Sequence, residues 1–191
     1  MRFARKTALA TAAIAALTLG AISAQPSFAE DKPITVGGAP MYSNKNIIQN
    51  AMNSKDHTTL VAAVKAAGLV DTLQSAGPFT VFAPTNDAFA KLPAGTVDML
   101  LKPENKAKLT AILTYHVVPG RMSKADLMTK MASMGGKVEL KTVQGGSLWI
   151  GENMGKLWVW DEQGNKAQVT IPDVMQSNGV IDVVDTVLMP K

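Results

Sequence analysis

Histidine and cysteine, the residues most often found in catalytic and zinc sites, are scarce in this chain. The 191 residues include two histidines, His57 and His116, and no cysteine. A zinc site needs three or four histidine, cysteine or carboxylate ligands, and the spacing indicates no such set. There is no Gly-x-Ser-x-Gly segment, and the run from Gly151 to Lys156 has too few residues between its glycines for a phosphate-binding loop. We therefore expect no enzymatic activity and no cofactor.

Methionine is the unusual feature of the composition, with eleven residues in the chain, and its thioether can act as a metal ligand. Met128, Met131 and Met134 recur at intervals of three, close to one face of a predicted helix, and Met122 lies just upstream. Thioether sulfurs are soft ligands that suit Cu(I). Methionine more commonly fills cores or contact surfaces, and it can also be consumed by oxidants. A periplasmic small-ligand or Cu(I)-handling protein that uses these four methionines is therefore the alternative to a plain binding protein.

Two tryptophans alternate along one predicted strand. Trp158 and Trp160 are two positions apart, so their side chains point to the same face, and Trp149 lies nearby on the preceding strand. Two interpretations remain open. The rings either cover the core of the domain or form an aromatic surface that stacks on a sugar or another protein.

The first 29 residues have the pattern of a secretory signal peptide. A basic start is followed by an apolar run from Ala8 to Ile22, and small residues precede a predicted cleavage site after Ala29, with Ala24 as a second candidate. The run is short and rich in alanine and threonine, so we expect cleavage and no stable membrane insertion afterwards. The sequence thus predicts a secreted or periplasmic protein.

The charge of the remaining chain is close to balanced. The full chain has 19 Lys and Arg against 15 Asp and Glu, and three of the basic residues but no acidic residue lie in the first 29 positions. A nearly neutral body excludes nucleic acid as the expected partner. Basic residues do gather in residues 121–141, which is either a solvated face or a docking site for an anionic surface polymer. They are Arg121, Lys124, Lys130, Lys137 and Lys141.

The order of the predicted elements indicates a single α+β domain. Residues 30–42 contain Pro33, Gly37, Gly38 and Pro40 and are predicted to be a flexible tether, and the domain is predicted over residues 43–190. Helical patterns dominate up to Met134, including a helix that begins with a capping box at Ser123. Short β-branched or aromatic segments separated by glycine turns follow, which favours antiparallel strands. Helices first and strands later are typical of an α+β fold.

Several segments, taken together and in order, resemble the fasciclin (β-Ig-H3) domain. The quoted segments are Thr59–Val64, Phe79–Phe89, Leu92-Pro93, Leu113–Gly120, Gly145–Leu148, Asn178–Ile181 and Asp185–Pro190. The resemblance implies a compact α+β wedge, in which helices pack against a small antiparallel β-sandwich. It also implies a secreted, periplasmic or surface-bound binding module without enzymatic activity. Such a module acts in cell adhesion or matrix contacts, and we expect a monomer whose partner is a cell-surface protein or polysaccharide.

Two matched motifs imply binding residues. In animal relatives a Tyr-His pair is implicated in integrin contact, and it corresponds here to Tyr115-His116. The Pro-Asp-Ile-Met adhesion motif of those relatives resembles Pro172-Asp173-Val174-Met175. Val174 replaces Ile, Ile171 stands where those relatives carry Glu, and Asp182 stands where many relatives have His. Other interpretations of the motifs are structural. Tyr115 and His116 lie in an apolar run and are expected to form a buried hydrogen-bonding pair, and Asp173 could begin or bend a strand after Pro172.

Overall fold

The computed structural model describes residues 32–191, which form one compact unit. The predicted signal peptide and its cleavage site after Ala29 lie outside the described residues. Where the sequence predicts a flexible tether, the structure has a hairpin of β1 (Ile34–Val36) and β2 (Ala39–Met41). Gly37 and Gly38 both have positive φ, as a two-residue hairpin turn requires. Val36 and Met41 are buried against the domain, so this segment is part of the folded core.

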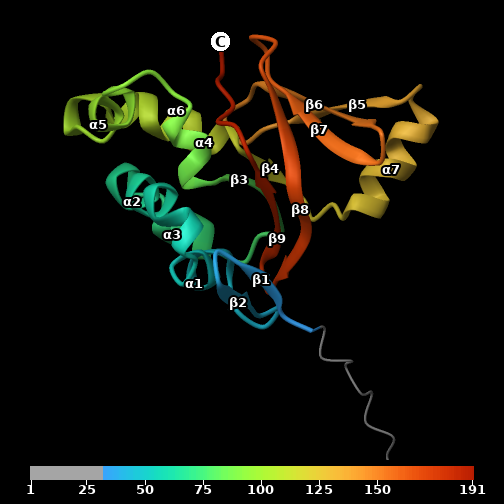
Figure 1. Ribbon diagram of the computed structural model, residues 1–191, viewed down its shortest axis with the longest axis horizontal. Helices are drawn as coiled ribbons and strands as arrows, with labels where there is room; N and C mark the ends of the chain where they lie inside the picture. Colours follow the sequence, from blue (N-terminus) through green and yellow to red (C-terminus); the bar gives the residue numbers. More distant parts are fainter. Residues whose placement is uncertain (1–31) are drawn as a thin grey trace, which may run out of the picture. The chain divides into compact units, whose positions relative to one another are not determined.

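All the helices of the described residues lie between Ile47 and Ser133 (Figure 1). They are α1 (Ile47–Ala51), η1 (Lys55–His57), α2 (Thr58–Ala67), α3 (Val70–Gln74), α4 (Asn86–Ala90), α5 (Thr96–Leu100), η2 (Pro103–Asn105), α6 (Lys106–Tyr115) and α7 (Lys124–Ser133). Local chemistry sets several of their ends. The expected capping box at Ser123 starts α7, and Gly68 ends α2 in the left-handed conformation. The first helix begins after Asn46, whose side chain caps it.

The strands form one seven-stranded sheet in the order β4-β3-β9-β8-β7-β6-β5. They are β3 (Phe79–Pro84), β4 (Val117–Pro119), β5 (Lys137–Lys141), β6 (Ser147–Asn153), β7 (Lys156–Trp160), β8 (Lys166–Gln176) and β9 (Gly179–Val184). All neighbouring strands are antiparallel except β3 and β9, which are parallel. The α+β class is confirmed. The sheet is mixed rather than purely antiparallel because β9 pairs in parallel with β3, which lies about a hundred residues earlier in the chain.

Two apolar cores flank the central strands. Helices α1–α6 cover one face of β3 and β9, and on the other side lie β5–β7 and α7 (Figure 1). In β3, Val81 and Ala83 belong to the first core and Phe82 to the second. This alternation places apolar side chains on both faces of the central pair, as is usual for parallel strands. Register shifts in β8 at Ile171 mark an irregularity where the sheet changes from the central strands to the outer ones.

Asn178 joins three elements at the turn between β8 and β9. Its Oδ1 accepts a hydrogen bond from the Ile47 N–H at 3.0 Å, and its Nδ2 donates to the carbonyls of Leu73 and Ser75, both at 2.8 Å. The side chain therefore serves the start of α1 and the end of α3 together. A Cβ added at the next residue, Gly179, would overlap the Phe79 carbonyl of the parallel neighbour, so only glycine fits there.

Of the helices in residues 32–191, none combines the length and the apolar character needed to cross a bilayer.

Candidate functional site

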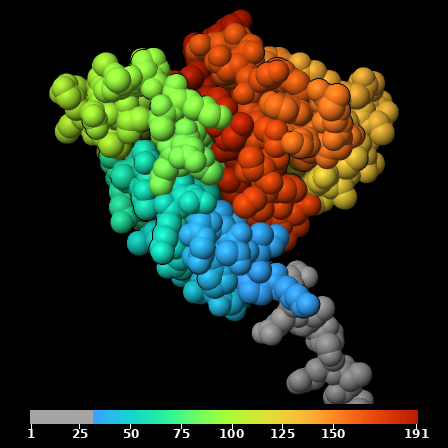
Figure 2. Space-filling view, in the orientation of Figure 1, coloured from blue at the N-terminus to red at the C-terminus, as the bar shows by residue number. Residues whose placement is uncertain are grey.

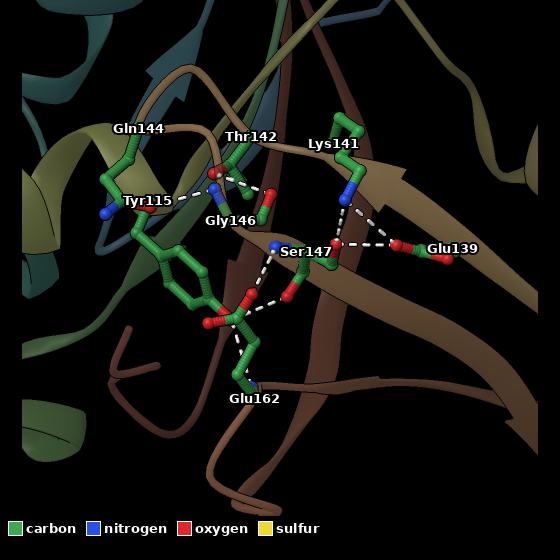
Figure 3. A network of polar contacts seen from close by, with 8 residues as sticks. All are labelled: Tyr115, Glu139, Lys141, Thr142, Gln144, Gly146, Ser147 and Glu162. Atoms are coloured by element: carbon green, nitrogen blue, oxygen red, sulfur yellow. Dashed lines mark hydrogen bonds and ion pairs between the residues drawn. The ribbon is translucent and has the colours of Figure 1, made fainter. Parts of the chain in front are cut away.

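Tyr115 of the first predicted motif is fully buried and ties α6 to the outer strands. Its hydroxyl donates to the Ser147 carbonyl at 2.6 Å and accepts from the Glu162 N–H at 3.0 Å, and the Glu162 carboxylate accepts from the Ser147 N–H at 2.9 Å (Figure 3). Burial raises the pKa of Tyr115 to about 12, so the hydroxyl keeps its proton. The phenol is thus a neutral structural link between the end of α6, β6 and the turn after β7.

Replacing Tyr115 by phenylalanine should destabilise the fold without changing its shape. The ring would remain, but the Ser147 carbonyl and the Glu162 N–H would lose their partner, which costs about 1–3 kcal/mol for a buried group. Urea unfolding of the variant measures this loss. The matched change Tyr42→Phe, at a residue 41% exposed, should leave stability unaltered. Equal stabilities for Tyr115→Phe and wild type would mean that water replaces the hydroxyl.

His116 is also buried, with both ring nitrogens engaged. Its Nδ1 lies 2.8 Å from the Ile112 carbonyl, to which it donates, and its Nε2 accepts from the Leu188 N–H at 3.0 Å. These partners define one neutral tautomer. Burial lowers the pKa of His116 to about 4, so the ring is uncharged at neutral pH. The Tyr-His pair therefore matches the structural interpretation of the sequence, and neither side chain is presented to a partner.

The second predicted motif lies within β8 at its irregular turn. Pro172, Asp173 and Met175 are partly exposed, while Val174 is buried. Asp173 has a φ of 59°, a left-handed conformation that aspartate tolerates better than most residues. Its carboxylate accepts from the Lys124 N–H at the start of α7, at 2.6 Å. The motif's carboxylate thus holds the first turn of α7 against the sheet.

Asp182 stands directly behind this motif and is the most perturbed carboxyl in the described residues. Its Oδ1 accepts from the Asp173 N–H at 3.0 Å, while its Oδ2 is buried without a hydrogen-bond partner in residues 32–191. Burial raises the pKa of Asp182 to about 7, with a further contribution from the nearby Asp173 carboxylate. The sequence singled out both aspartates but did not predict that they meet, because the contact depends on the irregular pairing of β8 with β9.

The four methionines of the Cu(I) alternative are divided between core and solvent. Met131 and Met122 are buried in the second core, whereas Met128 is 39% and Met134 63% exposed. The Met122 sulfur also lies 3.6 Å from the Lys130 ammonium. A soft-metal site requires several sulfurs that converge on one point. Nothing in this arrangement supports such a site, and the methionines of α7 follow its amphipathic pattern instead.

The tryptophans form a partly exposed surface on the outside of the sheet. In β7 the core positions are Leu157 and Val159, so Trp158 and Trp160 face away from the core. Trp149 of β6 lies directly opposite Trp160 in the ladder. The ammonium of Lys137 lies 5.7 Å and 4.8 Å from the ring centroids of Trp149 and Trp160, and that of Lys166 lies 5.2 Å from Trp158. We call these five residues the tryptophan surface.

Of the two interpretations left open for the tryptophans, the structure favours the exposed one. Neither lysine was predicted as part of an aromatic surface. The register places both on the same face, because Lys166 lies opposite Trp160 and Lys137 lies opposite Gly151, which is itself opposite Trp158. In the space-filling view, β5–β8 and α7 together form the orange to yellow part of the surface, beside the green and teal helical part (Figure 2). Within residues 32–191, no group of three or more His, Cys, Asp or Glu could hold a metal ion.

This arrangement, helices on one face of a mixed sheet whose parallel pair is buried on both faces, is that of a fasciclin domain. The fasciclin domain family model matches residues 55–190, and the chain belongs to this family. The solved structure of a FAS1 domain pair from the insect cell adhesion molecule fasciclin I matches this fold with a TM-score of 0.67 at 22% identity. The match covers 76% of this chain and 51% of that one.

Relatives are found in bacteria and animals. Protein sll1483 of Synechocystis sp. is 45% identical, with 97% of this chain and 98% of that protein aligned. Cell surface glycolipoprotein MPB83 of Mycobacterium bovis is 34% identical over 85% of this chain and 69% of its own length. Transforming growth factor-beta-induced protein ig-h3 of Sus scrofa is 40% identical over 69% of this chain, which corresponds to 17% of that larger protein.

Proposed function

We propose that this protein is a secreted or periplasmic, non-enzymatic contact module that binds a component of a cell surface through its tryptophan surface. The family supports the general role, since one relative is a cell surface glycolipoprotein and the fold is that of a cell adhesion molecule. The predicted signal peptide supports export. A non-enzymatic role agrees with the state of His116, whose two ring nitrogens are both engaged within the fold and so are not free for acid–base chemistry.

The observation that carries the proposal is the outward position of three tryptophans. A large aromatic ring that is not needed in the core is costly to leave in water, and such rings are enriched where proteins bind partners. The two motifs matched to relatives present fewer free side chains for contact with a partner. Tyr115 and His116 are buried, and the Asp173 carboxylate is already engaged by α7. The tryptophan surface is therefore the better candidate for direct contact.

Removing two of these rings should strongly weaken adhesion. Beads coated with the chain from residue 30 onward are compared for binding to the producing cells, using wild type and Trp158→Ala/Trp160→Ala. We expect at least about a tenfold loss, as for other central aromatic contacts. The matched control is Tyr42→Ala/Lys45→Gln, which removes an aromatic ring and a lysine that lie 5.0 Å apart elsewhere on the domain. The control should adhere as well as wild type.

Each variant is first checked for an unchanged melting curve. Equal adhesion by folded wild type and the double tryptophan variant would overturn the proposed contact site. Under that result, Asp173→Ala would be compared next, because Asp173 is the partly exposed charged residue of the second motif.

A further inference from the structure

On the outer face of β6 and β7, the three rings of the tryptophan surface form one nearly continuous aromatic area. The ladder places Trp149 opposite Trp160 and Gly151 opposite Trp158. Directly paired side chains on one face of a sheet lie about 5 Å apart at Cβ. A Cβ added to Gly151 would lie 2.9 Å from Cζ3 of Trp160. The six-membered ring of Trp160 therefore lies across Gly151, in space that any larger residue would occupy, and the three rings make a shallow surface rather than separate projections.

The tryptophan surface and its surroundings carry a net positive charge. The outward-facing charged positions of β5, β7 and β8 are Lys137, Glu139, Lys141, Lys156 and Lys166. Glu139 is engaged by Lys141 at 3.2 Å and by the Ser147 hydroxyl at 2.6 Å. Within residues 32–191, neither Lys137 nor Lys166 makes an ion pair, and their ammonium groups lie over the rings instead. The surface thus offers aromatic faces with cations at their edges.

We propose that the tryptophan surface binds a carboxylated polysaccharide, with sugar rings stacked on the tryptophans and uronate carboxylates paired with Lys137 and Lys166. This inference rests on the proposed function and specifies its partner. A pyranose ring has a face of C–H groups that packs on an aromatic ring, and a carboxylate is the natural partner of a lysine that has none. Charge complementarity selects the acidic polymer over a neutral one.

A protein partner fits this surface less well. The buried centre of a protein interface is depleted of charged residues, whereas here an ammonium group lies within 6 Å of every ring. Displacing a lysine from an exposed ring costs only about 0.5–1 kcal/mol. A sugar ring can therefore take the place of the ammonium on the ring face while its acid group keeps the lysine nearby.

Tryptophan fluorescence reports on this surface alone. The chain has three tryptophans, and all three belong to the tryptophan surface. The chain from residue 30 onward is titrated with polygalacturonate, with fully methyl-esterified polygalacturonate, with polyglutamate and with oligothymidylate. The ester has the same sugar rings without the charge, polyglutamate has the charge without the rings, and oligothymidylate tests base stacking.

The expected result is a fluorescence change that saturates with polygalacturonate and is at least about tenfold weaker with the ester and with polyglutamate. Lys137→Gln/Lys166→Gln should weaken polygalacturonate binding about tenfold, the effect of two exposed ion pairs, and should leave binding of the ester unchanged. Trp158→Ala, followed through the remaining tryptophans, should weaken binding of both sugars. The control pair Lys106→Gln/Lys108→Gln, on the exposed side of α6, should have no effect.

Three outcomes would overturn the inference. Equal binding of polyglutamate and polygalacturonate would indicate attraction between charges alone, tighter binding of oligothymidylate would indicate a nucleic acid site, and no binding of any polymer would exclude a glycan. The last outcome remains distinct from failure of the proposed function. If adhesion to cells still requires Trp158 and Trp160 while no polymer binds, the contact site stands and its partner is a protein.

Discussion

Replacement of Asn178 by alanine is expected to lower the free energy of unfolding by about 3–5 kcal/mol, because three backbone groups, two in buried hydrogen bonds and one in a partly buried one, would lose their side-chain partner. These are the Ile47 N–H and the carbonyls of Leu73 and Ser75, which belong to the ends of two different helices. A domain of this size is stable by only about 5–15 kcal/mol in total. The variant should therefore melt far below the wild type.

Chemical unfolding followed by circular dichroism measures the Asn178→Ala effect. Asn53→Ala is the matched control, since Asn53 is exposed and makes a single side-chain bond to the Gln49 carbonyl at 3.0 Å. The control should change stability by less than about 0.5 kcal/mol. A loss of similar size in both variants would show that Asn178 does not join α1 and α3 in the way that its contacts indicate.

The second large effect is expected from Asp182→Asn and depends on pH. The substitution should raise the free energy of unfolding by about 2 kcal/mol at pH 8 and change it little at pH 4. The folded-state pKa of Asp182 is raised from 3.8 to about 7, so the folded protein holds this proton more tightly than the unfolded chain does. Its contribution is therefore greatest below about pH 4 and is lost as the pH rises through 7. Asparagine keeps the acceptor for the Asp173 N–H but cannot ionise.

His116 has the opposite effect on the pH dependence of stability, over nearly the same pH range. Its folded-state pKa is lowered from 6.5 to about 4, so stability falls as the pH drops through that interval, because the unfolded chain takes up the proton first. Burial also lowers the pKa of His57, which adds to this loss. In the wild type, protonation of Asp182 offsets the cost at the histidines. Between about pH 4.5 and 6.5 the wild type should therefore lose less stability on acidification than Asp182→Asn, which lacks the compensating proton.

Unfolding free energies at pH 4, 6 and 8 test this compensation. Asp126→Asn is a control of opposite sign, since the hydroxyl and N–H of Ser123 donate to the Asp126 carboxylate and lower its pKa. That variant should lose stability at pH 8. If Asp182→Asn also lost stability at pH 8, the buried carboxylate would be a favourable contact and the account of its pKa would be wrong.

The sequence by itself determined the α+β class, the placement of Trp158 and Trp160 on one face of a strand, and several helix ends. These features are set by neighbouring residues. The Ser123 hydroxyl and the Asp126 carboxylate form a capping box within four residues, and Gly68 ends α2 because glycine accepts a left-handed conformation. The order of the matched segments also identified the fasciclin family, which the comparisons confirmed.

Tertiary structure alone decided what each candidate site residue can touch. Alternation in β7 showed that Trp158 and Trp160 share a face but not which face, because the core selects between two equally apolar sets and takes Leu157 and Val159. The sequence of residues 34–41 has the pattern of a tether, and only the tertiary structure shows that Val36 and Met41 are buried. Asp173 meets Asp182, and Asn178 reaches Ile47, through pairings between distant segments. Local patterns cannot specify such pairings, because a pairing forms only when the whole chain has closed around its cores.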